Sequence, residues 1–471
     1  MSAAFRVADV SAALGARPER PPDGAAVFPR VTIDSRRIAG GELFVAIRGE
    51  RHDGNRFVEA AVEAGAAGAV AEDRPFVGRE RIAFWAVPDG RAALQSLAGF
   101  HRRRLDVQVV GVTGSNGKTT TKELIAAVLS QGFPTARTLG NLNNQIGVPL
   151  TLLEIGAGHR WAVVEMGMNQ PGEIAPLARI AAPDIAVVTN VAASHLEGLG
   201  TVEAVLEEKL ELARALGPDG LLVYLGDQPM LREATAALPC RRLSYGLHPS
   251  NDLSPESWSL DEDGRGSFHL DGRTFRLRLT GKHNIVNALA AVAVGREAGL
   301  PVGAIAGGVA EPDALPLRMQ LERWGEVVAL VACYNANPES VISAAATLST
   351  LSGARRRIAV LGEMLELGSA SAEWHEWVGR ELAKDAVDLV VTVGPGAAPI
   401  AAGAEAAGLE TRRFRDRHSA EEWLVENVVP GDAILFKASR GAELETVVKP
   451  VRDACLDGTT AANGSASGRA R

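Results

Sequence analysis

The stretch VQVVGVTGSNGKTTTKELIAAVL, residues 107–129, decides the fold of the middle of this chain. Val107 to Val112 is a β-branched run that predicts a buried strand, and a turn-rich segment follows it. Backbone N–H groups of such a loop, together with the N-terminus of the next helix, converge on an anion. We therefore predict a phosphate-binding loop and helix start that comprise Gly114, Ser115, Asn116, Gly117, Lys118, Thr119 and Thr120.

Two side chains of this stretch suit a nucleotide with its metal ion. Lys118 would reach the terminal phosphates, and the hydroxyl of Thr119 would bind Mg²⁺. The spacing departs from the usual pattern, because Val112 stands where a glycine is expected and Gly111 precedes it by one residue. The alternative interpretation is an ordinary glycine turn between a strand and a helix. The Gly-Lys-Thr sequence between a predicted strand and a predicted helix favours phosphate binding.

Composition narrows the class of protein. The 471 residues are 46% hydrophobic and 23% charged, with a net charge of -8, which argues against a nucleic-acid partner. Cys240, Cys333 and Cys455 lack metal-ligand spacing and suit a reducing cytoplasm. We find no apolar run of membrane-spanning length, and the N-terminal residues lack the shape of a signal peptide. A cytoplasmic globular protein is the expectation.

The length and the pattern predict an α/β protein with three domains. We expect a small α/β domain over 1–104, a central domain with a doubly wound sheet over 105–315, and a Rossmann-like domain over 316–456. A disordered tail is expected over 457–471, which is rich in Gly, Ala, Ser and Thr.

The first domain offers polar groups beside its strand ends. Asp34, Ser35 and Arg36 follow one predicted strand, and the loop 49–55 follows another. Ser35 and Arg36 would hold an anionic ligand there. The alternative is a solvated turn with a helix cap.

Two more candidate residues follow strands of the central domain. Glu165 ends the apolar run WAVVE, and His195 lies a few residues beyond the run DIAVV. Ligands of doubly wound sheets gather at the carboxyl ends of strands, so we expect these residues to converge with Lys118. The alternative is that each is a solvated loop residue.

The helix predicted over 201–216 carries a lysine on its apolar stripe. Val205, Leu206, Leu212 and Ala213 surround Lys209 at helical spacing, and no carboxylate of the same helix faces it. Desolvation depresses the pKa of a lysine and makes its amine neutral and reactive. The alternative is a lysine that extends along the stripe to reach water.

Further along, RTFRLRLT pairs with SFHL in a predicted hairpin whose turn is Asp271-Gly272. Asn284 and Asn287 then share one face of an alanine-rich helix that a flat ring could approach closely.

In the third domain we predict strands in VVALVA, RRIAVLG, DLVVTVG and AILFKAS. The polar residues that follow these strands are Tyr334, Asn335, Asn337, Glu363, Lys437, Ser439 and Arg440. Domains that meet at such strand ends would form a closing cleft.

The motifs together resemble those of the Mur ligases over nearly the whole chain. The similar segments are GVTGSNGKTTTKE, NLNNQIGVPLTLL, VVEMGMNQPGEI, EEKLEL, GKHNIVNALAA, LRMQLE, YNANPES, VLGEMLELG and KASRG. Within that family, YNANP and LGEMLELG are similar to members that add D-alanyl-D-alanine to a UDP-N-acetylmuramoyl-tripeptide.

The resemblance implies an ATP-dependent peptide ligase of peptidoglycan precursor synthesis. ATP would phosphorylate the tripeptide carboxylate, and the amine of D-alanyl-D-alanine would displace the phosphate. Lys118, Arg318 and Mg²⁺ would supply positive charge, with Thr119, Glu165 and His195 near the metal ions. Lys209 matches a carbamylated lysine that would hold a second Mg²⁺. We expect a monomer.

The resemblance also implies binding residues. Asn284 and Asn287 match adenine-side positions, and Tyr334, Asn335 and Asn337 are assigned to nucleotide binding with them. The residues assigned to the two substrates are Ser35, Arg36, Asn143, Asn144, Lys437, Ser439 and Arg440.

The chain departs from the family pattern just before YNANP. Two aspartates are usual there, the second of them for the ribose hydroxyls, and this chain has Val331 and Ala332. Milder departures are Asn55 for a histidine, Glu363 for an aspartate and Ala438 for a glycine. Two alternatives therefore stand beside the ligase: a Mur ligase that adds a single amino acid, and a UDP-peptide-binding protein with weakened ATP use.

Overall fold

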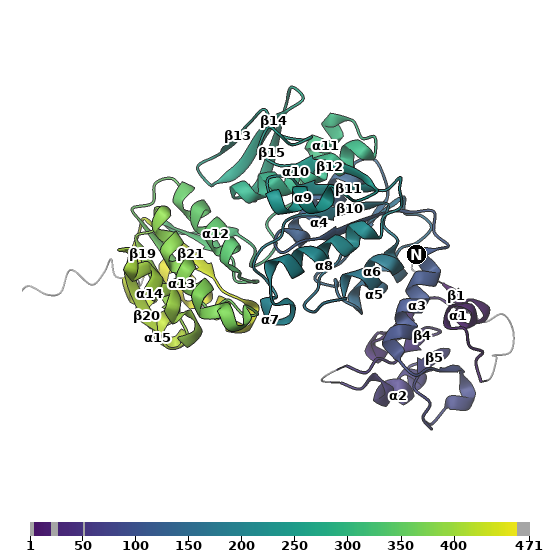
Figure 1. Cartoon of the computed structure of the whole chain (residues 1–471). Coiled ribbons are helices and arrows are strands. Elements are labelled where there is room, and N and C mark those ends of the chain that lie inside the picture. Colours follow the sequence, from purple (N-terminus) through teal and green to yellow (C-terminus); the bar gives the residue numbers. More distant parts are fainter. Residues whose placement is uncertain (1–3, 20–26, 50–51, 459–471) are drawn as a thin grey trace, which may run out of the picture.

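The computed structural model describes residues 4–19, 27–49 and 52–458, which form three α/β units along the chain (Figure 1). We call them the first unit (elements β1 to α3), the central unit (β7 to α11) and the third unit (β16 to α16). The predicted tail lies outside the described residues apart from its first two positions. No helix among the described residues is both long and apolar enough to cross a membrane.

A six-stranded parallel sheet forms the centre of the central unit. Its strand order is β12-β11-β10-β7-β9-β8. The strands are β7 (Gln108–Thr113), β8 (Thr135–Arg137), β9 (Trp161–Glu165), β10 (Ile185–Val188), β11 (Leu221–Leu225) and β12 (Arg241–Tyr245). The predicted strand over 107–112 is confirmed with a shift of one residue.

Helices cover both faces of this sheet, because successive side chains of a strand point to opposite faces. Val110 and Val112 of β7 pack in one apolar cluster with α4 and α10, whereas Val109 packs in another with α6 and α8. The helices are α4 (Lys118–Ser130), α5 (Gly147–Leu153), α6 (Ile174–Ala181), α7 (Leu196–Leu199), α8 (Val202–Arg214), α9 (Pro229–Thr235), α10 (Lys282–Glu297) and α11 (Val302–Val309). The doubly wound prediction is confirmed.

A three-stranded antiparallel sheet completes the central unit. Its strands are β13 (Ser257–Leu260), β14 (Arg265–Leu270) and β15 (Arg273–Thr280). Asp271 and Gly272 connect β14 to β15 with φ angles of 51° and 67°, as a tight hairpin turn requires. The hairpin was therefore correctly predicted from the Asp-Gly pair.

The third unit is a mixed sheet in the order β16-β17-β21-β18-β19-β20, in which only β16 pairs antiparallel. Its strands are β16 (Gln320–Trp324), β17 (Val327–Val331), β18 (Arg356–Leu361), β19 (Leu389–Val393), β20 (Glu410–Phe414) and β21 (Asp432–Lys437). Its helices are α12 (Pro338–Thr350), α13 (Ser371–Glu381), α14 (Ala398–Ala406), α15 (Arg417–Asn427) and α16 (Glu445–Leu456). The sequence missed β16 and β20 because QLERW and ETRRF are charged edge strands without an apolar run.

The first unit lies on the far side of the central unit from the third (Figure 1). Its parallel strands are β3 (Val31–Thr32), β4 (Leu43–Val45), β5 (Gly68–Ala71) and β6 (Ala83–Ala86), beside the antiparallel pair β1 (Phe5–Arg6) and β2 (Val27–Phe28). Its helices are α1 (Val7–Leu14), α2 (Val58–Glu63) and α3 (Gly90–Arg102). Helix α3 packs on α5 and α6 and so joins the first unit to the central one.

The topology places a crevice at the carboxyl end of β7. This strand lies between β9 and β10, and all three are parallel. The helix that follows β7 covers one face of the sheet, whereas the helices that follow β10 cover the other face. Connections that diverge in this way leave the opening where ligands bind in such sheets.

Candidate active site

The loop between β7 and α4 is held by the residues that follow β10. Ser115 N donates to Asn190 O (2.9 Å), and Asn116 N donates to Asn190 Oδ1 (2.7 Å). Gly114 has a φ of 151°, and a Cβ atom there would lie 1.8 Å from Thr189 Oγ1. Only glycine fits this position, so the loop is built around it.

Gly111, one residue before the position where the loop pattern expects a glycine, lets a helix pack closely on the sheet. It lies inside β7, and a Cβ atom there would lie 2.8 Å from Leu212 Cδ1 of α8. Its missing side chain lets α8 pack closely on the sheet, and α8 carries Lys209.

Glu165 is a buried carboxylate at the end of β9. One oxygen, Oε1, accepts from Thr119 Oγ1 (3.2 Å) and Asn143 Nδ2 (2.8 Å). The other, Oε2, is buried without a hydrogen bond and lies 3.9 Å from Lys122 Nζ. A buried carboxylate oxygen without a hydrogen bond is suited to a cation, and the Thr119 hydroxyl beside it is a second oxygen donor.

These donors fit a Mg²⁺ ion that takes its remaining ligands from phosphate and water. In the described part of the chain no three His, Cys, Asp or Glu side chains gather into a metal site. A site built mainly by protein ligands is therefore not what the described residues offer.

Lys118 follows the loop at the start of α4. Its Nζ donates to Gly114 O (2.6 Å) and Ser115 O (3.3 Å), so the ammonium folds back on the loop carbonyls. Burial lowers the pKa of Lys118, the charge of Glu165 opposes that shift, and Arg318 adds to it. The phosphate loop therefore adjoins charges from both the central and the third unit.

Lys209 is 1% exposed on α8. Burial lowers the pKa of Lys209 well below its usual value, and the nearby charge of Lys118 adds to the shift. No described residue forms a hydrogen bond or an ion pair with its amine. Glu208, its neighbour, accepts instead from Gly172 N (2.8 Å) and Ile174 N (2.7 Å). The alternative of a lysine that reaches water is wrong for this position.

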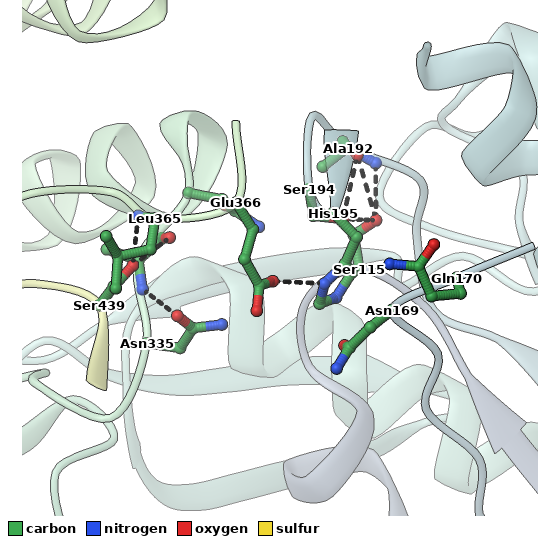
Figure 2. Close-up of polar contacts among 12 residues, drawn as sticks. Ser115, Asn169, Gln170, Ala192, Ser194, His195, Asn335, Leu365, Glu366 and Ser439 are labelled. Carbon is green, nitrogen blue, oxygen red and sulfur yellow. Dashed lines mark hydrogen bonds and ion pairs between the residues drawn. The ribbon is translucent and has the colours of Figure 1, made fainter. Parts of the chain in front are cut away.

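His195 occupies the N-cap of α7 with a φ of 56°. Its Nδ1 lies 2.6 Å from Glu366 Oε2, which belongs to the loop after β18 in the third unit (Figure 2). The contact with His195 lowers the pKa of Glu366. Sequence analysis singled out His195 and missed Glu366.

Asn284 and Asn287 share a buried face at the start of α10, as predicted. Asn287 Nδ2 donates to Asn284 Oδ1 (3.0 Å), and Asn284 Nδ2 donates to Thr280 O (2.8 Å). A Cβ atom on Gly117 would lie 2.6 Å from Asn287 Oδ1, so Asn287 lies against the phosphate loop. The assignment of Asn284 and Asn287 to the adenine side stays a prediction.

The third unit contacts the phosphate loop directly. Asn116 and Asn337 exchange two amide hydrogen bonds of 3.2 and 3.0 Å. Asn337 is also the N-cap of α12, where its side chain accepts from Ser340 N (3.0 Å). The amide pair therefore aligns the start of α12 with the loop.

Arg318 stands over the ring of Tyr334, with its guanidinium carbon 3.6 Å from the ring centre. Leu317 and Met319 on either side have φ angles of 61° and 53°. Bulky residues rarely adopt this left-handed conformation, so the surrounding structure holds the backbone that carries Arg318 in place.

Lys437 ends β21 and is buried. Its Nζ donates to Asn335 O (2.9 Å), and burial lowers the pKa of Lys437 to about 8. Ser439 is buried beside it, whereas Arg440 is exposed and pairs with Glu445 (3.0 Å). The structure thus brings Lys437 and Ser439 together with Asn335, and leaves Arg440 at the surface.

The predicted residues of the first unit lie apart from this site. Arg36 is 86% exposed and pairs with Asp34 (2.8 Å), and no described contact links it or Ser35 to the phosphate loop. The predicted anion loop 49–55 includes positions outside the described residues. Asn144 Oδ1 accepts from Ile146 N and Gly147 N and so caps α5. The assignment of these residues to substrate stays a prediction.

Val331 and Ala332 are 2% and 3% exposed at the end of β17. They pack in different apolar clusters, Val331 with residues of β18 and β21 and Ala332 with residues of α12. The apolar pair is therefore integrated into the packing of the third unit.

Sequence analysis also missed side chains that support the predicted ones. Lys122 is fully buried and donates to Thr138 O (2.8 Å), and Asn190 holds the phosphate loop. The signal for Lys122 was its position one turn after Lys118, and the signal for Asn190 was its position just after a strand. Glu366 was present in LGEMLELG, but nothing local indicates its partner.

Comparison with known protein families gives matches along most of the chain. Residues 28–102 match "Mur ligase family, catalytic domain", residues 112–295 match "Mur ligase middle domain", and residues 317–440 match "Mur ligase, glutamate ligase domain".

Several similar proteins carry the same name. The chain is 39% identical to a UDP-N-acetylmuramoyl-tripeptide–D-alanyl-D-alanine ligase of Bacillus subtilis, with 91% of this chain and 94% of that protein covered. It is 40% identical to the protein of the same name from Synechocystis, with 89% and 90% covered. The crystal structure of MurF from Acinetobacter baumannii superposes with a TM-score of 0.87 at 30% identity, covering 96% and 99%. MurF of Thermotoga maritima in complex with ADP gives 0.81 at 30% identity, covering 91% and 98%.

His283 generates a testable pH dependence. Its Nδ1 lies 3.1 Å from Ser343 Oγ across the boundary between α10 and α12, and burial lowers the pKa of His283 to about 4. An unfolded histidine titrates near 6.5, so between about pH 6.5 and 4 the unfolded chain binds the extra proton. The folded protein should lose up to about 3 kcal/mol of unfolding free energy over this window, and none from this residue above it.

Urea unfolding at several pH values measures this loss. His283→Gln should remove the His283 part of the slope between pH 6.5 and 4, while His248→Gln, an exposed histidine of the same unit, should leave the slope unchanged. A slope that is the same in wild type and in His283→Gln would contradict the lowered pKa.

Proposed function

The chain belongs to the Mur ligase family, and we propose that it joins D-alanyl-D-alanine to a UDP-N-acetylmuramoyl-tripeptide with consumption of ATP. The single observation that carries the proposal is the match to ligases of that name over 91% of this chain at 39% identity. The site agrees with it, because the phosphate loop, buried lysines and a carboxylate with a free oxygen are what an ATP-dependent ligase needs.

The chemistry sets the demands on the site. A carboxylate resists nucleophiles until one of its oxygens becomes a leaving group. Transfer of the γ-phosphoryl group of ATP to the tripeptide carboxylate gives an acyl phosphate and ADP. The amine of D-alanyl-D-alanine then attacks the carbonyl carbon, inorganic phosphate departs, and the amine gives up a proton. Phosphoryl transfer between anions depends on positioning and on positive charge.

The side chains around the loop supply that charge. Loop N–H groups and the start of α4 would bind the phosphates of ATP, and Lys118 would turn from its loop carbonyls to the terminal phosphate. Arg318 would reach the same oxygens from the third unit. Asn287 and Asn284 would lie on the adenine side, as would Tyr334 with its ring under Arg318.

Thr119, Glu165 and His195 would hold Mg²⁺, whose charge stabilises the transferring phosphoryl group. Lys209 is buried with a lowered pKa, so its amine is neutral often enough to add CO₂ and become an anion. That carbamate would serve a second Mg²⁺ ion and would account for a lysine without a protein partner.

The two substrates would enter from opposite sides of the loop. We assign the UDP group to Ser35 and Arg36 of the first unit and the tripeptide end to Asn143 and Asn144. The dipeptide would bind near Lys437, Ser439 and Arg440. The domains over 1–104, 105–315 and 316–456 would then bind the UDP group, the nucleotide with the tripeptide end, and the dipeptide, respectively.

We propose a monomer that acts in the cytoplasm, where ATP and UDP-linked precursors are found.

The first prediction from this function concerns the substrates. Release of phosphate from ATP should require both the UDP-tripeptide and D-alanyl-D-alanine, because the acyl phosphate needs its nucleophile to complete the turnover. A coupled phosphate assay with each substrate omitted in turn measures this. Turnover with UDP-dipeptide and a single amino acid such as lysine would assign the chain to another Mur ligase activity.

The second prediction concerns Lys209. Lys209→Ala should lower kcat by more than about 100-fold, the scale of losing a group that stabilises transition-state charge. Its unfolding midpoint should stay the same or rise, because a buried amine without a partner is removed. Added short-chain carboxylates should restore part of the rate. Lys384→Ala, at an exposed lysine, is the matched control.

The result that would contradict this role is a Lys209→Ala protein with the kcat of wild type.

The third prediction concerns the apolar pair before Tyr334. Absence of a charged hydrogen bond to ribose costs about 1.5–3 kcal/mol, or roughly 10- to 150-fold in ATP affinity. Such binding is shared by the ground and transition states, so it changes KM and leaves kcat nearly constant. Ala332→Asp, alone or with Val331→Asp, should therefore lower the KM for ATP.

Steady-state kinetics with ATP varied, together with thermal unfolding, tests this, because the new carboxylates lie among apolar side chains. An increase of kcat by orders of magnitude from near zero would instead show that the natural chain is a UDP-peptide-binding protein with weakened ATP use.

A further inference from the structure

Glu366 and His195 face each other across the boundary between the third and the central unit (Figure 2). His195 comes from the loop after β10, and Glu366 comes from the loop after β18, 171 positions later in the chain. Nδ1 and Oε2 are 2.6 Å apart, so the carboxylate touches the edge of the imidazole and restricts its orientation, although the two atoms do not form a hydrogen bond of normal geometry.

The loop that carries Glu366 is held on both sides of it. Met364 N donates to the buried His375 Nε2 (2.9 Å), and Leu365 N donates to Ser439 Oγ (2.9 Å). Glu197 N in the central unit donates to Glu366 O (3.0 Å). Glu366 itself has a φ of 65°, a conformation that a long side chain adopts only where its neighbours enforce it.

The loop that carries His195 is tied to the phosphate loop. Ser194 Oγ donates to Ser115 Oγ (2.9 Å), and Ala192 N donates to the same Ser115 oxygen (3.0 Å). Gly198 N and Leu199 N both donate to His195 O, which holds the left-handed backbone at His195. Figure 2 shows Ser115, Ala192 and Ser194 close to His195. A change in the position of His195 would therefore be transmitted through these hydrogen bonds to the phosphate loop.

A glycine allows the backbones of the third and the central unit to approach each other closely at this point. Gly368 has a φ of 62°, and a Cβ atom there would lie 3.2 Å from Glu197 Cα. Glu366 thus reaches His195 only while the third unit lies against α7.

A carboxylate in contact with one ring nitrogen of a histidine fixes the ring orientation and makes the other nitrogen a better ligand. Glu366 stands beside Nδ1 of His195 in this way. Among the described residues, no hydrogen bond to Nε2 is formed.

We propose that Glu366 is a positioning residue: the third unit supplies it to fix the orientation of the His195 imidazole, so that Nε2 is available to bind the divalent cation of the nucleotide site. The cation site is then complete only when the third unit has closed on the central one. This inference rests on the proposed function, in which His195 lies beside Mg²⁺.

The test is a double-mutant cycle on Glu366→Gln and His195→Asn. Asparagine tolerates the left-handed backbone at position 195, and glutamine keeps the size of Glu366 while it removes the charge. Glu197→Gln is the matched control, because Glu197 is exposed two residues from His195 and its side chain forms no hydrogen bond or ion pair with a described residue. Thermal unfolding checks that each variant is folded.

The first readout needs no turnover: binding of Mn²⁺ to the complex with ADP, followed by electron paramagnetic resonance. We expect Glu366→Gln and His195→Asn each to weaken Mn²⁺ binding about 10- to 100-fold, the usual effect of losing such a partner. The double variant should bind no more weakly than His195→Asn, because the two residues act as one unit. The kcat should follow the same pattern.

Wild-type Mn²⁺ affinity in Glu366→Gln would overturn the proposal, and so would effects of the two variants that multiply. If glutamine prevents folding, Glu366→Asp withdraws the carboxylate by one methylene and should still weaken Mn²⁺ binding several-fold. A wild-type protein without ligase turnover would overturn the proposed function alone, since the binding cycle measures Glu366 without it.

Discussion

Desolvated lysines around the phosphate loop are the constraint on which the rest of the structure depends. Burial lowers the pKa of Lys118, Lys209 and Lys437, and Lys118 and Lys209 also repel each other. A site of this kind disfavours its own positive charge until an anion arrives, and each bound phosphate relieves the repulsion. The buried carboxylate of Glu165 offsets part of it, which explains why that residue ends a strand next to the loop.

The topology of the sheet provides an opening beside these lysines in which a ligand can bind. β7 ends between two parallel strands, and the helices that follow β7 and β10 lie on opposite faces of the sheet, so the loop lies at an opening at the carboxyl edge of the sheet. Gly114 lets the loop pass within contact distance of Thr189, and Gly111 lets α8 approach until Lys209 lies near Lys118. Two glycines in one strand and loop therefore set the spacing of two lysines from different helices.

The local parts of this arrangement were predictable from sequence, whereas the contacts between units were not. The strand, loop and helix over 107–129, the lysine on an apolar stripe and the paired asparagines follow from spacing within one element. Glu366 opposite His195, and Asn116 paired with Asn337 at a separation of 221 residues, depend on how units dock, which periodicity does not encode. β16 and β20 were not predicted from the sequence, because these edge strands lack the apolar run of a central strand.

The amide pair between Asn116 and Asn337 shows what a nucleotide would have to change. Both amides bond to each other, and Lys118 donates to a carbonyl of its own loop, so these side chains already have partners among the described residues. A phosphate group would take over the hydrogen bond of Lys118 and gain a full charge interaction in return. Binding of the anion is thus an exchange of neutral contacts for charged ones. The third unit, which contributes Asn337, Arg318 and Glu366, is placed to respond to that exchange.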